Sequence, residues 1–162
     1  SFPAEFHGQT AVEAAMTLHA AIQGRLADID HIVIETQESG VRIIDKTGPL
    51  NNPADRDHCI QYMTAIGLMK GNLTAADYEE DVAQDPRVDA LRAKMVCVER
   101  KEWTRDYLDP SKRSIANAVQ VFFKDLAERI AAEAPAGQPA AAPLAATFEH
   151  ELNASLRSLF GR

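Results

Sequence analysis

The chain alternates between stretches whose apolar residues recur at helical spacing and stretches whose apolar residues recur at strand spacing. Residues 10–24 place apolar side chains three or four positions apart and end at Gly24, which predicts a helix. Residues 28–37 are rich in β-branched residues and predict a strand, which residues 40–45 extend or follow. Residues 114–125 alternate with a period of two, which predicts another strand. One face of that strand carries Ile115, Asn117, Val119, Val121 and Phe123.

The middle of the chain predicts a long buried helix that follows a loop. Residues 46–53 contain proline and asparagine and predict the loop. From Ala54 to about Lys70 the spacing is helical, and Gly71 closes the helix. Apolar residues cover much of the circumference of this helix, which predicts deep burial. These residues are Cys59, Ile60, Met63, Ile66 and Leu68.

Capping signals mark two shorter helices after it. Thr74, with Asp77 three residues later, is a variant of the capping box and starts a helix over residues 73–82. Asp85 followed by Pro86 predicts the start of the next helix, because the missing N–H of proline costs nothing there.

The remaining elements indicate the fold class. Residues 96–100 predict a strand and residues 107–113 a polar turn. Helices and strands interleave without the regular spacing of βαβ units, so we expect an α+β fold in which a small mixed or antiparallel sheet packs against helices. We assign residues 1–130 to this domain.

The composition changes at about residue 131. Residues 131–146 are rich in alanine and proline and predict a flexible linker, and we assign residues 147–162 to a C-terminal helix. The apolar stripe of this helix starts inside the linker and consists of Leu144, Phe148, Leu152, Leu156 and Leu159. An isolated amphipathic helix cannot bury such a stripe, so we expect it to dock on this domain, on another chain or on a segment outside the sequence.

Composition and charge narrow the possible functions. The chain is 46% hydrophobic and 25% charged, which is typical of a globular protein. A net charge of −7 argues against non-specific nucleic-acid binding, although a local group of cations could still bind an anionic small molecule. No stretch approaches the ~20 apolar residues that span a bilayer, and the first residues lack the features of a signal peptide. We therefore expect a soluble, cytoplasmic protein with neither a nucleic-acid nor a membrane partner.

Sequence motifs exclude several enzyme classes. The chain contains no GxGxxG, GxxxxGK[ST], GxSxG or HExxH motif. Its five histidines are too scattered to indicate a zinc site, so we expect no metal. Cys59 and Cys97 form no CxxC pattern, which favours free thiols in a reducing compartment.

Two pairs of residues could carry chemistry. His58 and Tyr62 are four positions apart, so a continuous helix would place them on one face. The imidazole could transfer a proton, and the phenol could donate to a carboxylate or an oxyanion. His7 and Gln9 precede the first helix, whose N-terminus suits an anionic substrate. The alternatives are residues at the edge of the core for the first pair and an ordinary loop for the second.

Three potential cations lie close together in sequence around the start of the long helix. Lys46, Arg56 and His58 would suit a polycarboxylate substrate. Three acids alternate with them, so a solvated surface that pairs its own charges fits equally well. The acids are Asp45, Asp55 and Asp57.

Long stretches of the sequence resemble one known family. They are FPAEFHGQTAVEAAMTLH, DKTGPLNNPADRDHCIQYM, LTAADYEEDV, DPRVDALRAKMVCVE and RDYLDPSKRSIANAVQVFFKD. From Phe2 to about Asp125 the chain resembles the C-terminal part of the 2-methylcitrate dehydratase branch of the MmgE/PrpD family, which also contains cis-aconitate decarboxylase. After Asp125 the sequence departs from the family pattern.

The resemblance implies the small α+β domain of a two-domain hydro-lyase, followed by a closing helix that returns to a large helical domain. Such enzymes convert 2-methylcitrate to 2-methyl-cis-aconitate in the methylcitrate cycle of propionate catabolism, and the resemblance implies no cofactor. Their site lies between the domains, so this chain would contribute one wall and would be inactive alone. The implied partners are a tricarboxylate substrate, the missing N-terminal helical domain and a second copy in a homodimer.

The resemblance also assigns roles to residues. A family histidine near the start of this segment falls on Gln9 by position or on His7 by chemistry. Tyr62 matches a tyrosine that lines the family's pocket, and His58 matches a histidine of the decarboxylases. We therefore expect catalytic roles for His58, Tyr62 and His7, and substrate-binding roles for Gln9, Lys46 and Arg56.

A second hypothesis of a different class remains open. The domain could be a non-catalytic folding or oligomerisation module. The Tyr62 face and residues 144–160 would then be interface surface.

Overall fold

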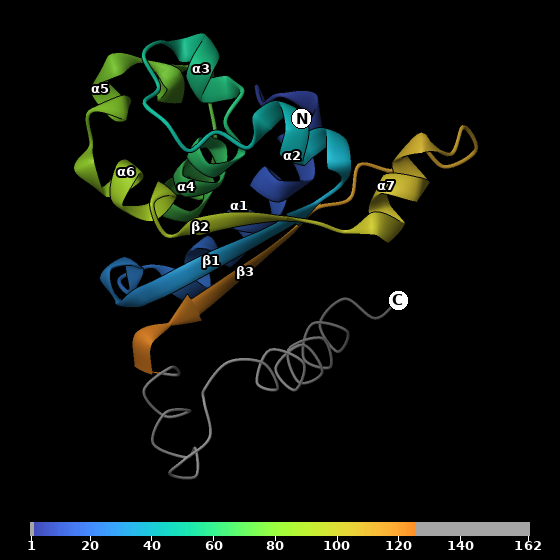
Figure 1. Cartoon of the computed structure of the whole chain (residues 1–162). Coiled ribbons are helices and arrows are strands. Elements are labelled where there is room, and N and C mark those ends of the chain that lie inside the picture. Colours follow the sequence, from blue (N-terminus) through green and yellow to red (C-terminus); the bar gives the residue numbers. More distant parts are fainter. Residues whose placement is uncertain (1, 126–162) are drawn as a thin grey trace, which may run out of the picture. The chain divides into compact units, whose positions relative to one another are not determined.

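The computed structural model of the chain describes residues 2–125, which form a small mixed sheet with helices packed on it (Figure 1). The central strand, β1 (Ile29–Thr36), pairs in parallel with β2 (Met95–Glu99) and antiparallel with β3 (Ala118–Phe123). This arrangement confirms the predicted α+β class. The longer helices are α1 (Gln9–Ile22), α2 (Glu38–Ile44), α4 (Ile60–Lys70), α6 (Pro86–Arg92) and α7 (Lys101–Leu108). The shorter helices are η1 (Phe6–Gly8), η2 (Leu26–Asp28), α3 (Pro53–Asp57), η3 (Ala75–Tyr78) and α5 (Glu80–Ala83).

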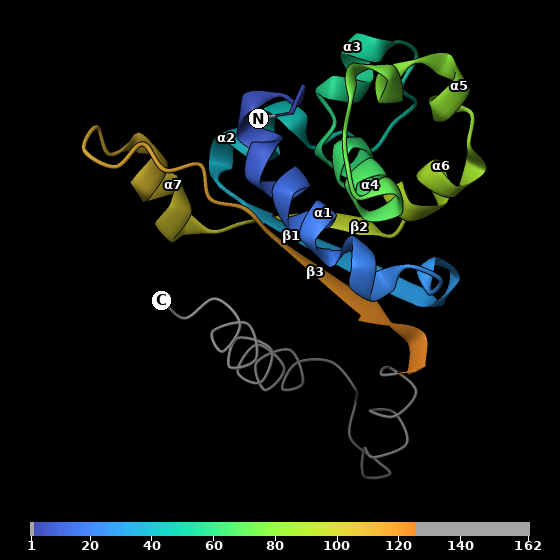
Figure 2. The same ribbon diagram turned by 180° about the vertical axis from the view of Figure 1, so that it is seen from behind.

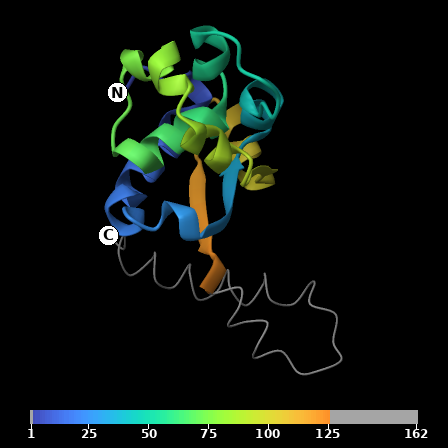
Figure 3. The same ribbon diagram turned by 90° about the vertical axis from the view of Figure 1, so that its left-hand side faces the viewer.

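The core lies between one face of the sheet and the helices α1 and α4 (Figures 2 and 3). Ile32 and Ile34 of β1 are fully buried, because alternate residues of a strand point to the same face. Helix α4 is buried along most of its length, as the sequence predicts. Its buried apolar residues include Ile60, Met63, Ile66 and Leu68.

Helices α1 and α4 approach closely at Gly67. A Cβ atom at this position would lie 2.9 Å from the Cβ of Ala15 and 3.3 Å from the carbonyl oxygen of Val12. Small residues on both helices therefore permit the close packing that places the start of α1 beside the core.

The segment after β1 differs from the prediction. Residues 40–45 do not extend the strand, because α2 begins directly after it at Glu38. Ile44 is fully buried and Val41 is half-buried, so this β-branched segment places its apolar side chains at helical spacing. Tertiary packing overrides the β propensity here.

The long helix predicted from Ala54 to Lys70 is wrong, because the chain forms two helices there. Helix α3 ends at Asp57, and the backbone of Cys59 is extended, with φ −123° and ψ 107°, before α4 begins. The predicted end is confirmed: Gly71 adopts the left-handed conformation with φ 68°.

The capping signals are confirmed, although the helices they start are shorter than predicted. Thr74 and Asp77 form a capping box around η3, a turn of 3-10 helix. The carboxylate of Asp85 accepts a hydrogen bond from the backbone N–H of Arg87 at the start of α6. Helix α7 is an element that the sequence pattern missed.

The last predicted strand is confirmed over a shorter range, since β3 covers Ala118–Phe123 within residues 114–125. Residues 107–113 contain the end of α7 and then the expected polar turn, in which the ammonium group of Lys112 pairs with Asp106 at 2.6 Å. The predicted linker, residues 131–146, and the predicted helix, residues 147–162, lie outside the described residues.

Candidate functional site

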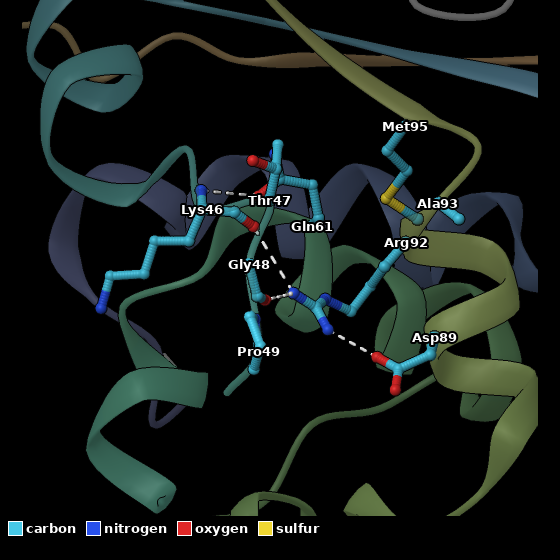
Figure 4. A pocket seen from close by; sticks show the side chains of 9 residues that line it. All are labelled: Lys46, Thr47, Gly48, Pro49, Gln61, Asp89, Arg92, Ala93 and Met95. Carbon is cyan, nitrogen blue, oxygen red and sulfur yellow. Dashed lines mark hydrogen bonds and ion pairs between the residues drawn. The ribbon is translucent and has the colours of Figure 1, made fainter. Parts of the chain in front are cut away.

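A pocket of about 510 Å³ lies between the loop that follows α2 and the last turn of α6 (Figure 4). Its other walls are a side chain of α4 and the first residue of β2. The lining residues are Lys46, Thr47, Gly48, Pro49, Gln61, Asp89, Arg92, Ala93 and Met95.

Arg92 holds the loop wall of this pocket. Its guanidinium donates to the carbonyl oxygen of Gly48 at 2.9 Å and approaches that of Lys46 at 3.5 Å, and it also pairs with Asp89 (Figure 4). The side chain is 11% exposed, and its Nε is buried without a hydrogen-bond partner among the described residues. Arg92 therefore holds the backbone of the loop in place, and its guanidinium is not available for a bidentate contact with a ligand.

Gln61 holds the same loop from the side of α4. Its side-chain oxygen accepts from the backbone N–H of Lys46 at 3.2 Å, and its amide donates to Asp45. The Lys46 side chain extends away from Arg92 (Figure 4). Its ammonium group lies 3.7 Å from Asp55. The Lys46 side chain is about one third exposed, whereas that of Arg56 is almost completely buried. Of these two predicted substrate-binding cations, solvent therefore reaches Lys46.

The predicted cations Arg56 and His58, at the end of α3, each pair with an acid. The Nδ1 of His58 contacts Asp57, and the imidazole is half exposed. Arg56 is buried and donates to the carbonyl oxygen of Tyr78 and to Glu80, each at 2.7 Å. The hydrogen bond and charge of Arg56 lower the pKa of Glu80. Of the three predicted cations, Lys46 and His58 pair with acids of the same segment, as the self-paired alternative predicts. Arg56 does not, because it is buried and pairs with Glu80. The substrate-binding roles stay predictions.

Tyr62 does not share a helical face with His58, because α3 ends between them. Its side chain is buried and donates to the carbonyl oxygen of Asp77 at 2.6 Å, and its ring stacks on that of Tyr78. Burial raises the pKa of Tyr62 to about 12, so the phenol is a neutral donor at physiological pH. The predicted geometry of one face is wrong, while the catalytic role of either residue stays a prediction.

Asp77 connects this buried cluster to α4. Burial by itself would raise its pKa, but hydrogen bonds from Lys70 and Thr74 outweigh burial and lower it. The carboxylate is almost completely buried, with 1% of the side chain exposed. Asp77 therefore stays ionised and fixes η3 against α4.

His7 lies in a hydrogen-bonded chain of side chains at the N-terminal end of α1. Its Nδ1 is 2.8 Å from Oε1 of Glu5, and its Nε2 is 3.0 Å from the hydroxyl oxygen of Tyr107 on α7. The residue is 8% exposed. The structure therefore supports His7 as an oriented imidazole.

Gln9 has a different environment. Its side-chain amide donates to the carbonyl oxygens of Phe2 and Ala4, at 3.0 and 2.6 Å. Gln9 thus fixes the N-terminal segment through its side-chain nitrogen. Its side-chain oxygen takes no part in these two hydrogen bonds.

Sequence reasoning missed Arg92 and Tyr107. Arg92 lies in the last turn of α6, and no spacing rule connects it to a loop more than 40 residues earlier. The sequence pattern predicts a polar turn at Tyr107, whereas the residue lies on α7. The signal that could have found α7 is the i, i+4 spacing of Trp103 and Tyr107 within RKEWTRDYL.

The described residues contain no group of three or more histidine, cysteine, aspartate or glutamate side chains that could hold a metal ion. In the same part of the chain, no helix is long and apolar enough to cross a membrane.

Comparison with known proteins adds independent information. Residues 2–147 match the family described as MmgE/PrpD C-terminal domain. The chain is 63% identical over 128 residues to the 2-methylcitrate dehydratase of Salmonella typhimurium, an alignment that covers 77% of this chain and 26% of that protein. It is 60% identical over 142 residues to the Escherichia coli protein of the same name, covering 85% of this chain and 29% of that protein.

A eukaryotic relative is similar too. The mitochondrial 2-methylcitrate dehydratase of Yarrowia lipolytica is 58% identical over 128 residues, which cover 77% of this chain and 25% of that protein. The chain thus spans between 25% and 29% of the length of these relatives. A match that begins at residue 2 and includes every described element shows that the chain belongs to the MmgE/PrpD family and contains its C-terminal domain.

Proposed function

We propose that the chain is the C-terminal part of a hydro-lyase that dehydrates 2-methylcitrate to 2-methyl-cis-aconitate, and that it forms one wall of a site shared with an upstream helical domain. The observation that carries this proposal is the 60–63% identity to proteins named 2-methylcitrate dehydratase. The family match, residues 2–147, includes all six predicted site residues.

The chemistry explains why one wall is proposed. Elimination of water needs a base for the carbon-bound proton, an acid for the departing hydroxyl and cations for the carboxylates. His7 and His58 offer imidazoles and Lys46 a partly exposed cation. The polar groups of Arg56 and Tyr62 donate hydrogen bonds to other residues of the domain. The described residues therefore supply part of the required set.

Exposed apolar side chains support a covered face at one end of the domain. Phe6 is 58% exposed and Leu108 is 70% exposed. Each is the sequence neighbour of a residue in the His7 cluster, Phe6 beside His7 and Leu108 beside Tyr107. We propose that this face meets the helical domain, because exposed large apolar side chains mark surfaces that other parts of a protein cover.

Two further expectations stay part of the proposal. We expect a homodimer and a cytoplasmic location. The relative from Yarrowia lipolytica is named as mitochondrial, so the compartment is to be measured for this protein by fractionation.

The test uses the complete reading frame that encodes this segment. The purified enzyme is expected to convert 2-methylcitrate, detected by the ultraviolet absorbance of the new conjugated double bond. Absence of turnover by a folded full-length enzyme would contradict the proposed function. The chain of residues 1–162 alone is expected to be inactive, and activity from it would overturn the one-wall arrangement.

A matched pair of variants tests the substrate-binding role of Lys46. Lys46→Gln is expected to raise KM for 2-methylcitrate by roughly 10-fold with little change in kcat, because a cation that contacts a carboxylate in both ground and transition states contributes uniform binding. Lys124→Gln, which removes an exposed lysine of the same domain, is expected to leave KM unchanged.

A further inference from the structure

Tyr107 and His7 are brought together from positions 100 residues apart in the chain. Tyr107 lies on α7, which the sequence pattern did not predict, and His7 lies in η1 directly before α1. Figure 1 shows that α7 stands at the opposite end of the domain from α5 and α6. Spacing rules between near neighbours in the sequence therefore cannot predict the contact between Tyr107 and His7.

Glu5 determines the state of the imidazole. An ionised carboxylate only accepts hydrogen bonds, so the Nδ1 of His7, at 2.8 Å from Oε1, is the protonated nitrogen. The other carboxylate oxygen accepts from the backbone N–H of His7, also at 2.8 Å. Glu5 thus fixes both the tautomer and the position of the ring.

The tautomer in turn determines the direction of the next hydrogen bond. With Nδ1 protonated, Nε2 of the neutral imidazole is an acceptor, and the hydroxyl of Tyr107 donates to it across 3.0 Å. Asn117 completes the support, because its amide donates to the carbonyl oxygen of His7 at 2.8 Å. The phenol is therefore aligned to give its proton to His7 when it receives another.

We propose that Tyr107, His7 and Glu5 form a proton relay of the hydro-lyase, with Tyr107 as the group that meets the substrate. This inference rests on the proposed function and adds Tyr107 and Glu5 to its machinery. It uses the order carboxylate, imidazole, hydroxyl, in which the imidazole accepts the proton and the carboxylate stabilises the imidazolium that forms.

The balance of the step follows from this order. The phenolic oxygen takes the proton from the carbon adjacent to the one that bears the leaving hydroxyl, while its own proton passes to Nε2 of His7. The electron pair of the C–H bond becomes the new double bond, and the C–O bond breaks. The departing hydroxide takes a proton from a general acid of the helical domain and leaves as water. His7 then returns its proton to Tyr107, and the proton from carbon is released to solvent.

The location of the relay agrees with a role in a shared site. Tyr107 is half-buried. The residues next to His7 and Tyr107 in sequence, Phe6 and Leu108, have exposed side chains. A surface of this kind is suited to closing over a substrate once another domain covers it, because excluded water strengthens the hydrogen bonds within.

The test uses the full-length enzyme and compares kcat with KM. Tyr107→Phe keeps the ring and removes only the hydroxyl, and it is expected to lower kcat by roughly 100-fold or more while KM changes little. His7→Gln is expected to lower kcat similarly, and Glu5→Gln by a smaller factor. The double variant Tyr107→Phe/His7→Gln is expected to be no slower than the slower single variant, because groups that act as a unit are not additive. Lys101→Gln, at the exposed start of α7, serves as the control with wild-type kcat.

The outcomes separate the two proposals. An inactive, folded wild-type enzyme contradicts the proposed function itself. An active wild type with Tyr107→Phe near the wild-type kcat overturns the relay and leaves the proposed function standing. Additive effects in the double variant would also overturn the relay, since they would show that Tyr107 and His7 act independently. Melting temperatures of all variants identify any loss of activity that is due to unfolding. If Tyr107→Phe does not fold, the kcat of Glu5→Gln tests the relay instead, and a wild-type value would overturn it.

Discussion

The hydroxyl of Tyr62 donates a hydrogen bond to the carbonyl oxygen of Asp77 at 2.6 Å, and both residues are buried. Tyr62→Phe removes the donor and leaves the buried carbonyl oxygen unpaired, so we expect a loss of about 1–3 kcal/mol in the free energy of unfolding. Urea titration of the domain measures this loss.

The same variant tests the catalytic role predicted for Tyr62. In the full-length enzyme, kcat is compared after correction for the folded fraction. A corrected kcat close to the wild-type value would contradict that role, whereas an unchanged free energy of unfolding would contradict the structural one.

Asp77 is expected to make the domain sensitive to acid. Its pKa in the folded state is below the ordinary value of 3.8, so its contribution to stability is present above that value and is lost as the pH falls through the folded-state pKa. Asp77→Asn is therefore expected to cost about 1–3 kcal/mol at neutral pH, because charge-assisted hydrogen bonds from Lys70 and Thr74 are weakened.

Urea titrations of wild type and Asp77→Asn from neutral pH to about pH 3 check this, and the difference between the two is expected to shrink in acid. Asp28→Asn is the control, because that carboxylate is 62% exposed and 3.9 Å from its partner. A difference that does not change with pH would show that the charge of Asp77 is not responsible.

Arg92 is expected to control the mobility of the loop at the pocket. Arg92→Ala removes the donors to the carbonyl oxygens of Lys46 and Gly48, so amide hydrogen exchange in residues 46–48 is expected to accelerate by roughly 10-fold or more. Arg87→Ala removes an arginine of the same helix whose side chain is 71% exposed, and it is expected to leave exchange in this loop unchanged. Equal exchange rates in the two variants would refute the anchoring role of Arg92.

Gly67 is expected to tolerate no side chain. An added methyl group would lie 2.9 Å from the Cβ of Ala15, so Gly67→Ala is expected to lower the free energy of unfolding by about 1–3 kcal/mol despite the better helix propensity of alanine. Gly48→Ala is the control, because no atom beyond the two neighbouring residues lies within 4 Å of the added methyl. Thermal unfolding of both variants measures the difference, and a Gly67→Ala variant more stable than wild type would show that α1 and α4 can separate at little cost.

Local signals in the sequence predicted the parts of the fold that depend on near neighbours. The capping box of Thr74 and Asp77, the N-cap Asp85 and the left-handed Gly71 each involve a few consecutive residues, so their sequence patterns were sufficient. The buried positions of α4 followed from its apolar circumference. Residues 40–45 were misassigned because packing of Ile44 into the core outweighs the β propensity of the segment.

Long-range contacts decided which predicted site residues are available for chemistry. The spacing of His58 and Tyr62 predicts one helical face, but the extended backbone of Cys59 divides the segment. Arg56 and Tyr62 then point into the domain and bond to backbone 22 and 15 residues away in sequence, while His58 stays at the surface. Such bonds depend on how the chain returns on itself, and helical spacing cannot predict this.

The family, the α+β class and the candidate imidazoles follow from the amino-acid sequence alone, because each rests on residue identity or on local periodicity. Only the tertiary structure placed Tyr107 at 3.0 Å from His7 and Arg92 beside the loop of Lys46. The physical reason is that these contacts join segments separated by 46 to 100 residues, and hydrogen-bond geometry at that separation is fixed by the packing of the whole domain.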